Sequence, residues 1–73
     1  MEFDKKVFGG RVRLLRANKN YSLQDVAIAL KTDKGTISNM ESGKKGISVE
    51  KLMLLADYFD VSTDYLLGRT DEP

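Results

Sequence analysis

Residues 22–41, with the sequence SLQDVAIALKTDKGTISNME, decide the fold. Ser22 is a good helix N-cap, and Asp25 stands three residues later, where a capping box places an acidic side chain. Asp33 is the next N-cap and follows a short connector at 31–32. One face of the first segment is apolar and contains Leu23, Val26, Ala27 and Leu30. We therefore expect two short helices joined by about three residues.

The second of these helices combines a narrow apolar stripe with a polar face. Ile37 and Met40 are its apolar positions, and Gly43 stands where a C′ glycine ends a helix. Its polar face contains Lys34, Thr36, Ser38, Asn39 and Ser42. A helix-turn-helix has this construction, because its first helix braces a second helix whose N-terminal side chains enter the DNA major groove.

An apolar stripe precedes this segment. Phe8, Val12 and Leu15 recur at i, i+4 and i+7, which predicts a helix over residues 5–19. Two adjacent glycines, Gly9 and Gly10, weaken its first turn, since each costs about 1 kcal/mol against alanine. We expect this helix to be firm only from about Gly10 onward.

Two further helices follow the loop 44–46. Ser48 caps a helix whose apolar face contains Leu52, Leu55, Ala56 and Phe59, and Ser62 caps a short helix closed by Gly68. The polar tail 69–73 is predicted to be frayed. No segment alternates with period two, so the predicted fold class is all-α. Five helices form one compact domain over residues 1–73, a normal length for a single domain.

The composition excludes several classes of protein. The 73 residues include no cysteine and no histidine, so disulfides, thiolate metal sites and the commonest general base are absent. No Gly-rich phosphate loop occurs, and we expect no enzymatic activity, no metal and no cofactor. No run of about 18 apolar residues occurs, and the N-terminus lacks the apolar stretch of a signal peptide. We expect a cytoplasmic protein that does not bind membranes.

Charge is distributed unevenly along the chain. Residues 1–20 carry six basic and two acidic side chains, whereas residues 47–73 carry two basic and six acidic ones. The overall net charge of +1 conceals this difference. A basic N-terminal part suggests that one face meets a polyanion. A solvated surface of mixed charge is the alternative reading of the same counts.

These segments together resemble the lambda-repressor-like, or XRE, family of bacterial and phage DNA-binding domains. The resemblance covers roughly residues 8–68, with the helix-turn-helix motif at 22–41. The residues that carry it are Arg11–Arg16, Ser22–Ala27, Leu30, Thr36–Ser38, Glu41–Lys44, Leu52, Leu55, Ala56, Phe59, Val61, Ser62 and Asp64–Gly68. Their order and spacing are more specific than any one of the pieces.

The resemblance implies a set of DNA-binding residues. Lys34 lies in the first turn of the recognition helix and can donate to guanine or to a phosphate, and Asn39 can pair with adenine. Thr36 and Ser38 can contact bases or phosphates, and the residues after the helix contact the sugar-phosphate backbone. The full set is Ser22, Gln24, Lys34, Gly35, Thr36, Ser38, Asn39, Ser42, Lys44 and Lys45. An ordinary solvated surface is the alternative for the lysines.

Two residues depart from the family pattern. The family usually has a polar side chain at the position of Gly35, so either the backbone approaches DNA closely there or one base contact is missing. We favour the missing contact. The family often has glutamine at the position of Leu23, where it contacts a phosphate. That role passes here to Ser22, Gln24 or the backbone N–H groups of the helix N-terminus.

The resemblance also implies structural contacts. Arg16 and Glu41 match a structural ion pair that ties the first helix to the third, while Arg11 and Arg13 either contact phosphates or face solvent. The last helices of the family often form a two-fold dimer contact, for which Leu54, Tyr58, Tyr65 and Leu66 are the candidates. The alternative is that these four residues complete the core of the monomer.

The function that follows is sequence-specific binding of double-stranded DNA. The resemblance implies a transcriptional regulator, a repressor that binds a palindromic operator as a homodimer and occludes a promoter. No small-molecule ligand is evident from the sequence. The alternative is a protein-interaction module, antitoxin-like or antirepressor-like, that keeps the fold but has little affinity for DNA.

Overall fold

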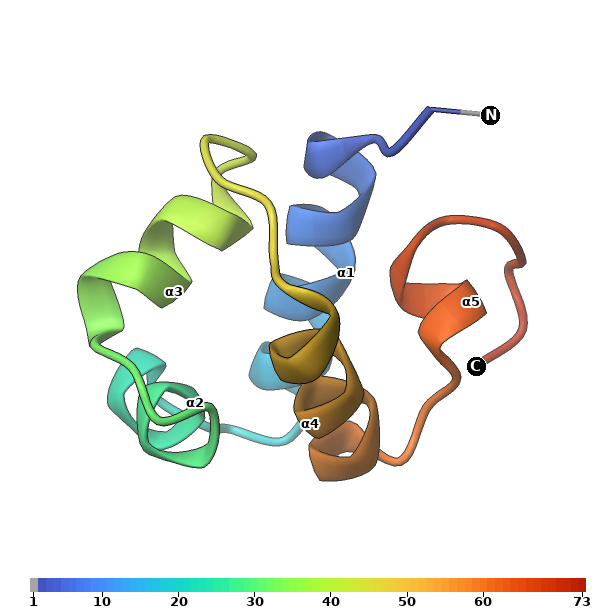
Figure 1. The fold of residues 1–73 in the computed structure, drawn as a ribbon. Coiled ribbons are helices and arrows are strands. Elements are labelled where there is room, and N and C mark those ends of the chain that lie inside the picture. The colour runs from blue at the N-terminus through green and yellow to red at the C-terminus, as the bar shows by residue number, and fades with distance from the viewer. Residues whose placement is uncertain (1) are drawn as a thin grey trace.

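The computed structural model describes residues 2–73, and this part of the chain forms five helices (Figure 1). They are α1 (Lys5–Asn18), α2 (Leu23–Ala29), α3 (Lys34–Glu41), α4 (Val49–Phe59) and α5 (Thr63–Leu66). No strand occurs within residues 2–73, which confirms the all-α prediction. None of these helices is long and apolar enough to cross a membrane.

The predicted caps begin four of the helices. Ser22, Asp33, Ser48 and Ser62 each accept a hydrogen bond from the backbone N–H three residues later. At α2 the capping box is complete, because the Asp25 carboxylate also accepts a hydrogen bond from the Ser22 N–H at 2.8 Å. Caps of this kind are worth about 1 kcal/mol each, which helps to explain how such short helices form.

The start of α1 differs from the prediction. The helix begins at Lys5, so the expectation that it is firm only from Gly10 is wrong. Asp4 caps it, accepting hydrogen bonds from the Lys6 N–H at 2.9 Å and the Val7 N–H at 3.2 Å. A Cβ on Gly9 would lie 2.7 Å from the Glu41 carbonyl oxygen, so this glycine lets α1 and α3 approach closely.

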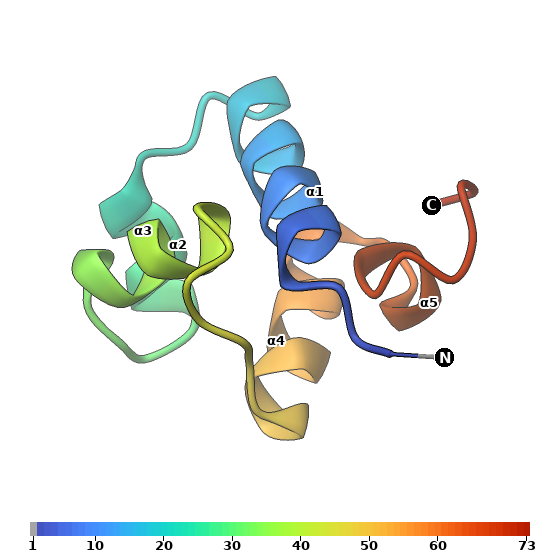
Figure 2. The same cartoon turned by 90° about the horizontal axis from the view of Figure 1, so that it is seen from above.

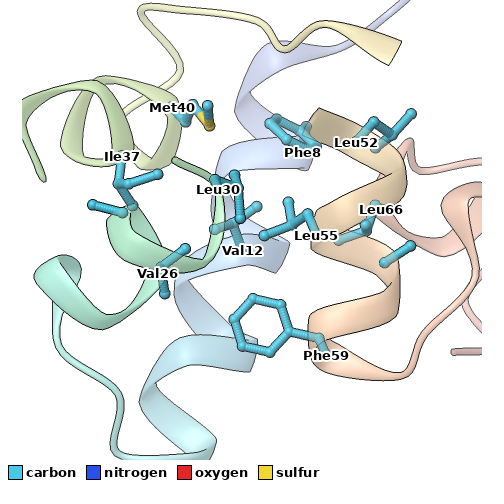
Figure 3. Packing of buried hydrophobic residues seen from close by; sticks show 12 residues of the cluster. Phe8, Val12, Val26, Leu30, Ile37, Met40, Leu52, Leu55, Phe59 and Leu66 are labelled. Atoms are coloured by element: carbon cyan, nitrogen blue, oxygen red, sulfur yellow. The ribbon is translucent and has the colours of Figure 1, made fainter. Parts of the chain in front are cut away.

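The apolar core is shared by all five helices (Figure 3). Its members have at most a tenth of their surface exposed, and burying each of the larger side chains stabilises the fold by about 1.5–3 kcal/mol. They are Phe8, Val12, Val26, Ala27, Leu30, Ile37, Met40, Leu52, Leu55, Ala56, Phe59 and Leu66. The core therefore fixes α2 and α3 as one unit against the other helices.

The helices place two different faces on opposite sides of the molecule. In two perpendicular views, α2 and α3 lie on one side and α5 on the other, with α1 and α4 between them (Figures 1 and 2). α1 contacts both α3 and α5. The helix-turn-helix side is thus separated from the acidic C-terminal side by α1 and α4.

The tail 69–73 packs against α1, contrary to the prediction that it is frayed. The Arg11 guanidinium lies 4.3 Å from the ring centre of Tyr65 and donates hydrogen bonds to the carbonyl oxygens of Tyr65 and Thr70. It also pairs with the Asp71 carboxylate at 2.8 Å. The Arg11 side chain is only 18% exposed, so neither expectation for it, phosphate contact or solvation, describes its position.

Candidate DNA-binding interface

α3 has one face in the core and one face in solvent. Ile37, Met40 and Glu41 are buried, as the helical period requires for residues one turn apart. The opposite face and the loop after it are exposed, and they carry Lys34, Gly35, Ser38, Asn39, Ser42, Lys44 and Lys45. Thr36 is half-buried and is the least accessible of the residues predicted on this helix.

The start of α3 is close enough to the loop after it for their charges to interact. The Asp33 carboxylate accepts a hydrogen bond from the Thr36 N–H at 2.7 Å. Hydrogen bonds from Thr36 lower the pKa of Asp33, and the positive charge of Lys45 lowers it further. The loop after α3 thus adds positive charge to the surroundings of the carboxylate that caps this helix.

Gly35 has a structural explanation that sequence reasoning did not consider. A Cβ at this position would lie 3.2 Å from Oδ1 of Asp33, closer than an ordinary contact. Glycine leaves room for the cap that begins α3. This explanation is independent of whether a base contact is missing there.

The start of α2 places Ser22 and Gln24 at the surface beside α3. Both residues are exposed, but the Ser22 hydroxyl already accepts the Asp25 N–H at 3.0 Å as part of the capping box. Leu23, the other departure from the family pattern, is half-buried and packs against the core. A leucine at this position extends the core instead of contacting a phosphate.

An ion pair holds α3 in place. Nε of Arg16 lies 2.6 Å from Oε2 of Glu41, and Nη2 donates to Oε1 at 3.0 Å, so the pair predicted from the sequence is bidentate. Nη1 of the same guanidinium donates to the Tyr21 carbonyl oxygen at 3.0 Å. This hydrogen bonding to Glu41 raises the pKa of Arg16. One arginine thus joins α1, α3 and the loop before α2.

Arg13 adds a weaker contact that the sequence did not indicate. Its Nε lies 3.4 Å from Oε1 of Glu41, whose side chain is 2% exposed. The Arg13 side chain is 63% exposed and bridges the buried carboxylate to the surface. Only the i, i+3 spacing of Arg13 and Arg16 could have suggested that both face Glu41.

Most of the residues predicted as dimer contacts pack against other residues of the same chain. Leu66 is fully buried, so its assignment as a dimer contact is wrong. The ring of Tyr58 lies 5.2 Å from that of Tyr21, and Tyr65 lies under Arg11. Leu54 is half-buried. The exposed apolar side chains of α4 are instead Val49 at 74% and Met53 at 58%, a pair at i, i+4 outside the core stripe.

A comparison with known protein families decides the relationship. A family profile described as helix-turn-helix matches residues 12–66, which span α2, α3 and α4 and reach the end of α5. The chain belongs to the lambda-repressor-like (XRE) helix-turn-helix family. The predicted resemblance is therefore confirmed.

Curated relatives of this XRE domain come from Bacillus subtilis (strain 168). The HTH-type transcriptional regulator AnsR is 48% identical over 59 residues, which cover 81% of this chain and 51% of AnsR. The HTH-type transcriptional regulator ImmR is 30% identical over 63 residues, which cover 86% of this chain and 50% of ImmR. The chain spans about half the length of the curated relatives it matches. These relatives are transcriptional regulators and not enzymes.

Solved structures of similar proteins share the XRE fold. The restriction-modification controller protein C.AhdI from Aeromonas hydrophila superposes with a TM-score of 0.78 at 28% identity, over 86% of this chain and 96% of C.AhdI. The clp gene regulator ClgR from Corynebacterium glutamicum superposes with a TM-score of 0.81 at 27% identity, over 90% of this chain and 70% of ClgR. The family and its fold are those of DNA-binding transcription regulators.

Proposed function

We propose that this XRE domain binds double-stranded DNA sequence-specifically and regulates transcription, with α3 as its recognition helix. The observation that carries the proposal is the division of α3 into two faces. Its apolar face and Glu41 are held by the core and by Arg16, while its exposed face carries short polar side chains and Lys34. A rigidly held polar helix is what major-groove recognition requires.

The exposed residues divide into two proposed roles. Lys34 and Asn39 on α3 read base edges, with Ser38 beside them and Thr36 partly accessible. Contacts to the phosphates of the DNA backbone come from segments on both sides of this helix. These contacts involve Ser22 and Gln24 at the start of α2, and Ser42, Lys44 and Lys45 after α3. At Gly35 no side chain reaches a base, so the base pair facing it is read loosely.

We further propose that the regulator represses transcription as a homodimer on a palindromic operator. Occlusion of a promoter requires only that the bound domain occupies the DNA, which a domain of this size can do. Val49, Met53 and Leu54 give α4 an apolar surface available to a second copy. A two-fold dimer would place two recognition helices about 34 Å apart, one turn of DNA. Access to DNA would place the protein in the cytoplasm.

Fluorescence polarisation tests this proposal by comparing binding to two duplexes. One is the DNA upstream of the protein's own coding sequence, and the other is a scrambled duplex. Wild-type protein is expected to prefer the upstream duplex, and its affinity is expected to fall steeply between about 50 and 200 mM salt. Lys34→Ala and Asn39→Ala should reduce the preference, each by about 1–3 kcal/mol per lost base contact. Lys44→Ala should weaken binding to both duplexes alike. Absence of binding at low salt would contradict the proposal and favour the protein-interaction module.

A further inference from the structure

The first turn of α1 lies beside the loop that follows α3. Gly43 ends α3 with a φ of 81°, and a Cβ added there would lie 3.0 Å from Cγ of Lys6 and 3.4 Å from its Cα. The stem of Lys6 therefore lies against Gly43, directly before Lys44 and Lys45. Residues far apart in the sequence thus form one surface at the C-terminal end of the recognition helix.

The packing of α1 on α3 holds this arrangement in place. Gly9 lies against the carbonyl oxygens of Met40 and Glu41 in the last turn of α3, closer than any side chain would permit. One turn earlier, Asp4 caps α1 and so fixes the backbone of Lys6 through its N–H. The backbone position of Lys6 is set by contacts on both sides, and its side chain is exposed.

The lysines of this surface form no ion pair with any residue that the structure describes. Within residues 2–73 the ion pairs closer than 4 Å are made by arginines, and no lysine takes part. The surface is formed by exposed Lys5, Lys6, Lys44 and Lys45, with the acidic residues Glu2 and Asp4 in the same recess as Lys6. Four ammonium groups are set against two carboxylates, so positive charge predominates. Basic side chains in the first turn of a helix oppose its dipole, so local helix stability does not explain them.

We propose that Lys6 contacts a phosphate of double-stranded DNA, next to the phosphates contacted by the loop 44–45. This inference rests on the proposed function and adds α1 to the segments that contact DNA. The ligand is the phosphodiester backbone, so the contact contributes affinity for every sequence and no discrimination among them. Lys6 thereby extends the phosphate contacts beyond the helix-turn-helix motif at 22–41.

The salt dependence of binding to a random-sequence duplex tests this contact without knowledge of the operator. Neutralising one phosphate contact reduces the slope of log K against log salt by about 0.9. Lys6→Gln is expected to show this reduction, and Lys6→Arg is expected to retain the wild-type slope. Both variants should keep the wild-type circular dichroism spectrum, because the Lys6 side chain is exposed.

Arg69→Gln is the control, since it makes the same change in net charge in the segment after α5. This segment lies on the side of the molecule away from α3 (Figures 1 and 2). The slope for Arg69→Gln should equal that of wild type. An equal reduction for Arg69→Gln would show that the net charge of the protein determines the slope, and it would overturn the contact. A wild-type slope for Lys6→Gln would also overturn the contact. Wild-type protein that binds no duplex at low salt would overturn the proposed function as well, so the two failures are distinguishable.

Discussion

Gly9 and Gly10 are neighbours in α1, yet replacing each by alanine is expected to change stability in opposite directions. Both positions are helical, and Gly→Ala in a helix interior stabilises by about 1 kcal/mol when nothing obstructs the new methyl group. At Gly10 no atom beyond the neighbouring residues and the backbone of α1 itself lies within 4 Å of the added Cβ. At Gly9 the Cβ would lie 2.7 Å from the Glu41 carbonyl oxygen and closer still to that of Met40.

The expected magnitudes follow from these distances. Both obstructing atoms at Gly9 are backbone oxygens, which cannot rotate away, so the backbones of α1 and α3 must separate. Overpacking of this kind costs about 1–3 kcal/mol or more, which exceeds the gain in helix propensity. We expect Gly9→Ala to destabilise by about 1–2 kcal/mol and Gly10→Ala to stabilise by up to about 1 kcal/mol. For a domain of this length, 1 kcal/mol corresponds to roughly 4–8 °C in Tm.

Thermal and urea unfolding followed by far-UV circular dichroism measure both variants under the same conditions. The two variants differ by about 1–3 kcal/mol, so their Tm values should differ by roughly 4–24 °C, with wild type between them. Equal stability of the two variants would refute the close packing of α1 on α3. Because that packing also orients Lys6 and the loop after α3, Gly9→Ala should weaken DNA binding while Gly10→Ala leaves it unchanged.

Three further predictions concern side chains of α1, of α3 and of the cap that precedes α3. Glu41→Gln should lower the free energy of unfolding in urea by about 2 kcal/mol, because it removes the negative charge from a buried ion pair. Arg13→Ala, at an exposed position, should change it by less than about 0.5 kcal/mol. The folded-state pKa of Asp33 is lowered, so its stabilisation is present above its ordinary value of 3.8 and lost as the pH falls through the folded pKa. The difference in Tm between wild type and Asp33→Ala should therefore shrink as the pH falls below 3.8; a difference that grows would contradict it. Arg11→Gln should accelerate amide hydrogen exchange in residues 69–72, and unchanged exchange would show that Arg11 does not hold the tail.

Local signals predicted much of the fold. Helix caps depend on contacts three residues apart, and the serines and Asp33 that begin four helices could therefore be found from the sequence. The apolar stripes likewise predicted the faces of α3 and α4 that enter the core. The pairing of Arg16 with Glu41 came from the family resemblance and not from spacing, since 25 residues separate the two.

Features that depend on distant contacts could not be predicted in this way. Two glycines in one turn look equally destabilising, and only the position of α3 shows that Gly9 is required. Arg11 meets a tail about 60 residues later in the chain, so its sequence neighbours contain no sign of the contact. Leu66 and Met53 are both apolar residues on adjacent helices, and burial of the first and exposure of the second follow from how α5 packs on α1 and α4.

Selection of bound duplexes from a pool with a randomised central segment tests the central claim most directly. A regulator that reads bases with α3 should enrich one motif over successive rounds, with two inverted half-sites about 10 bp apart if it binds as a dimer. Asn39→Ala should change the preferred bases within that motif. Recovery of duplexes with no enriched sequence, from wild-type protein at moderate salt, would contradict sequence-specific recognition.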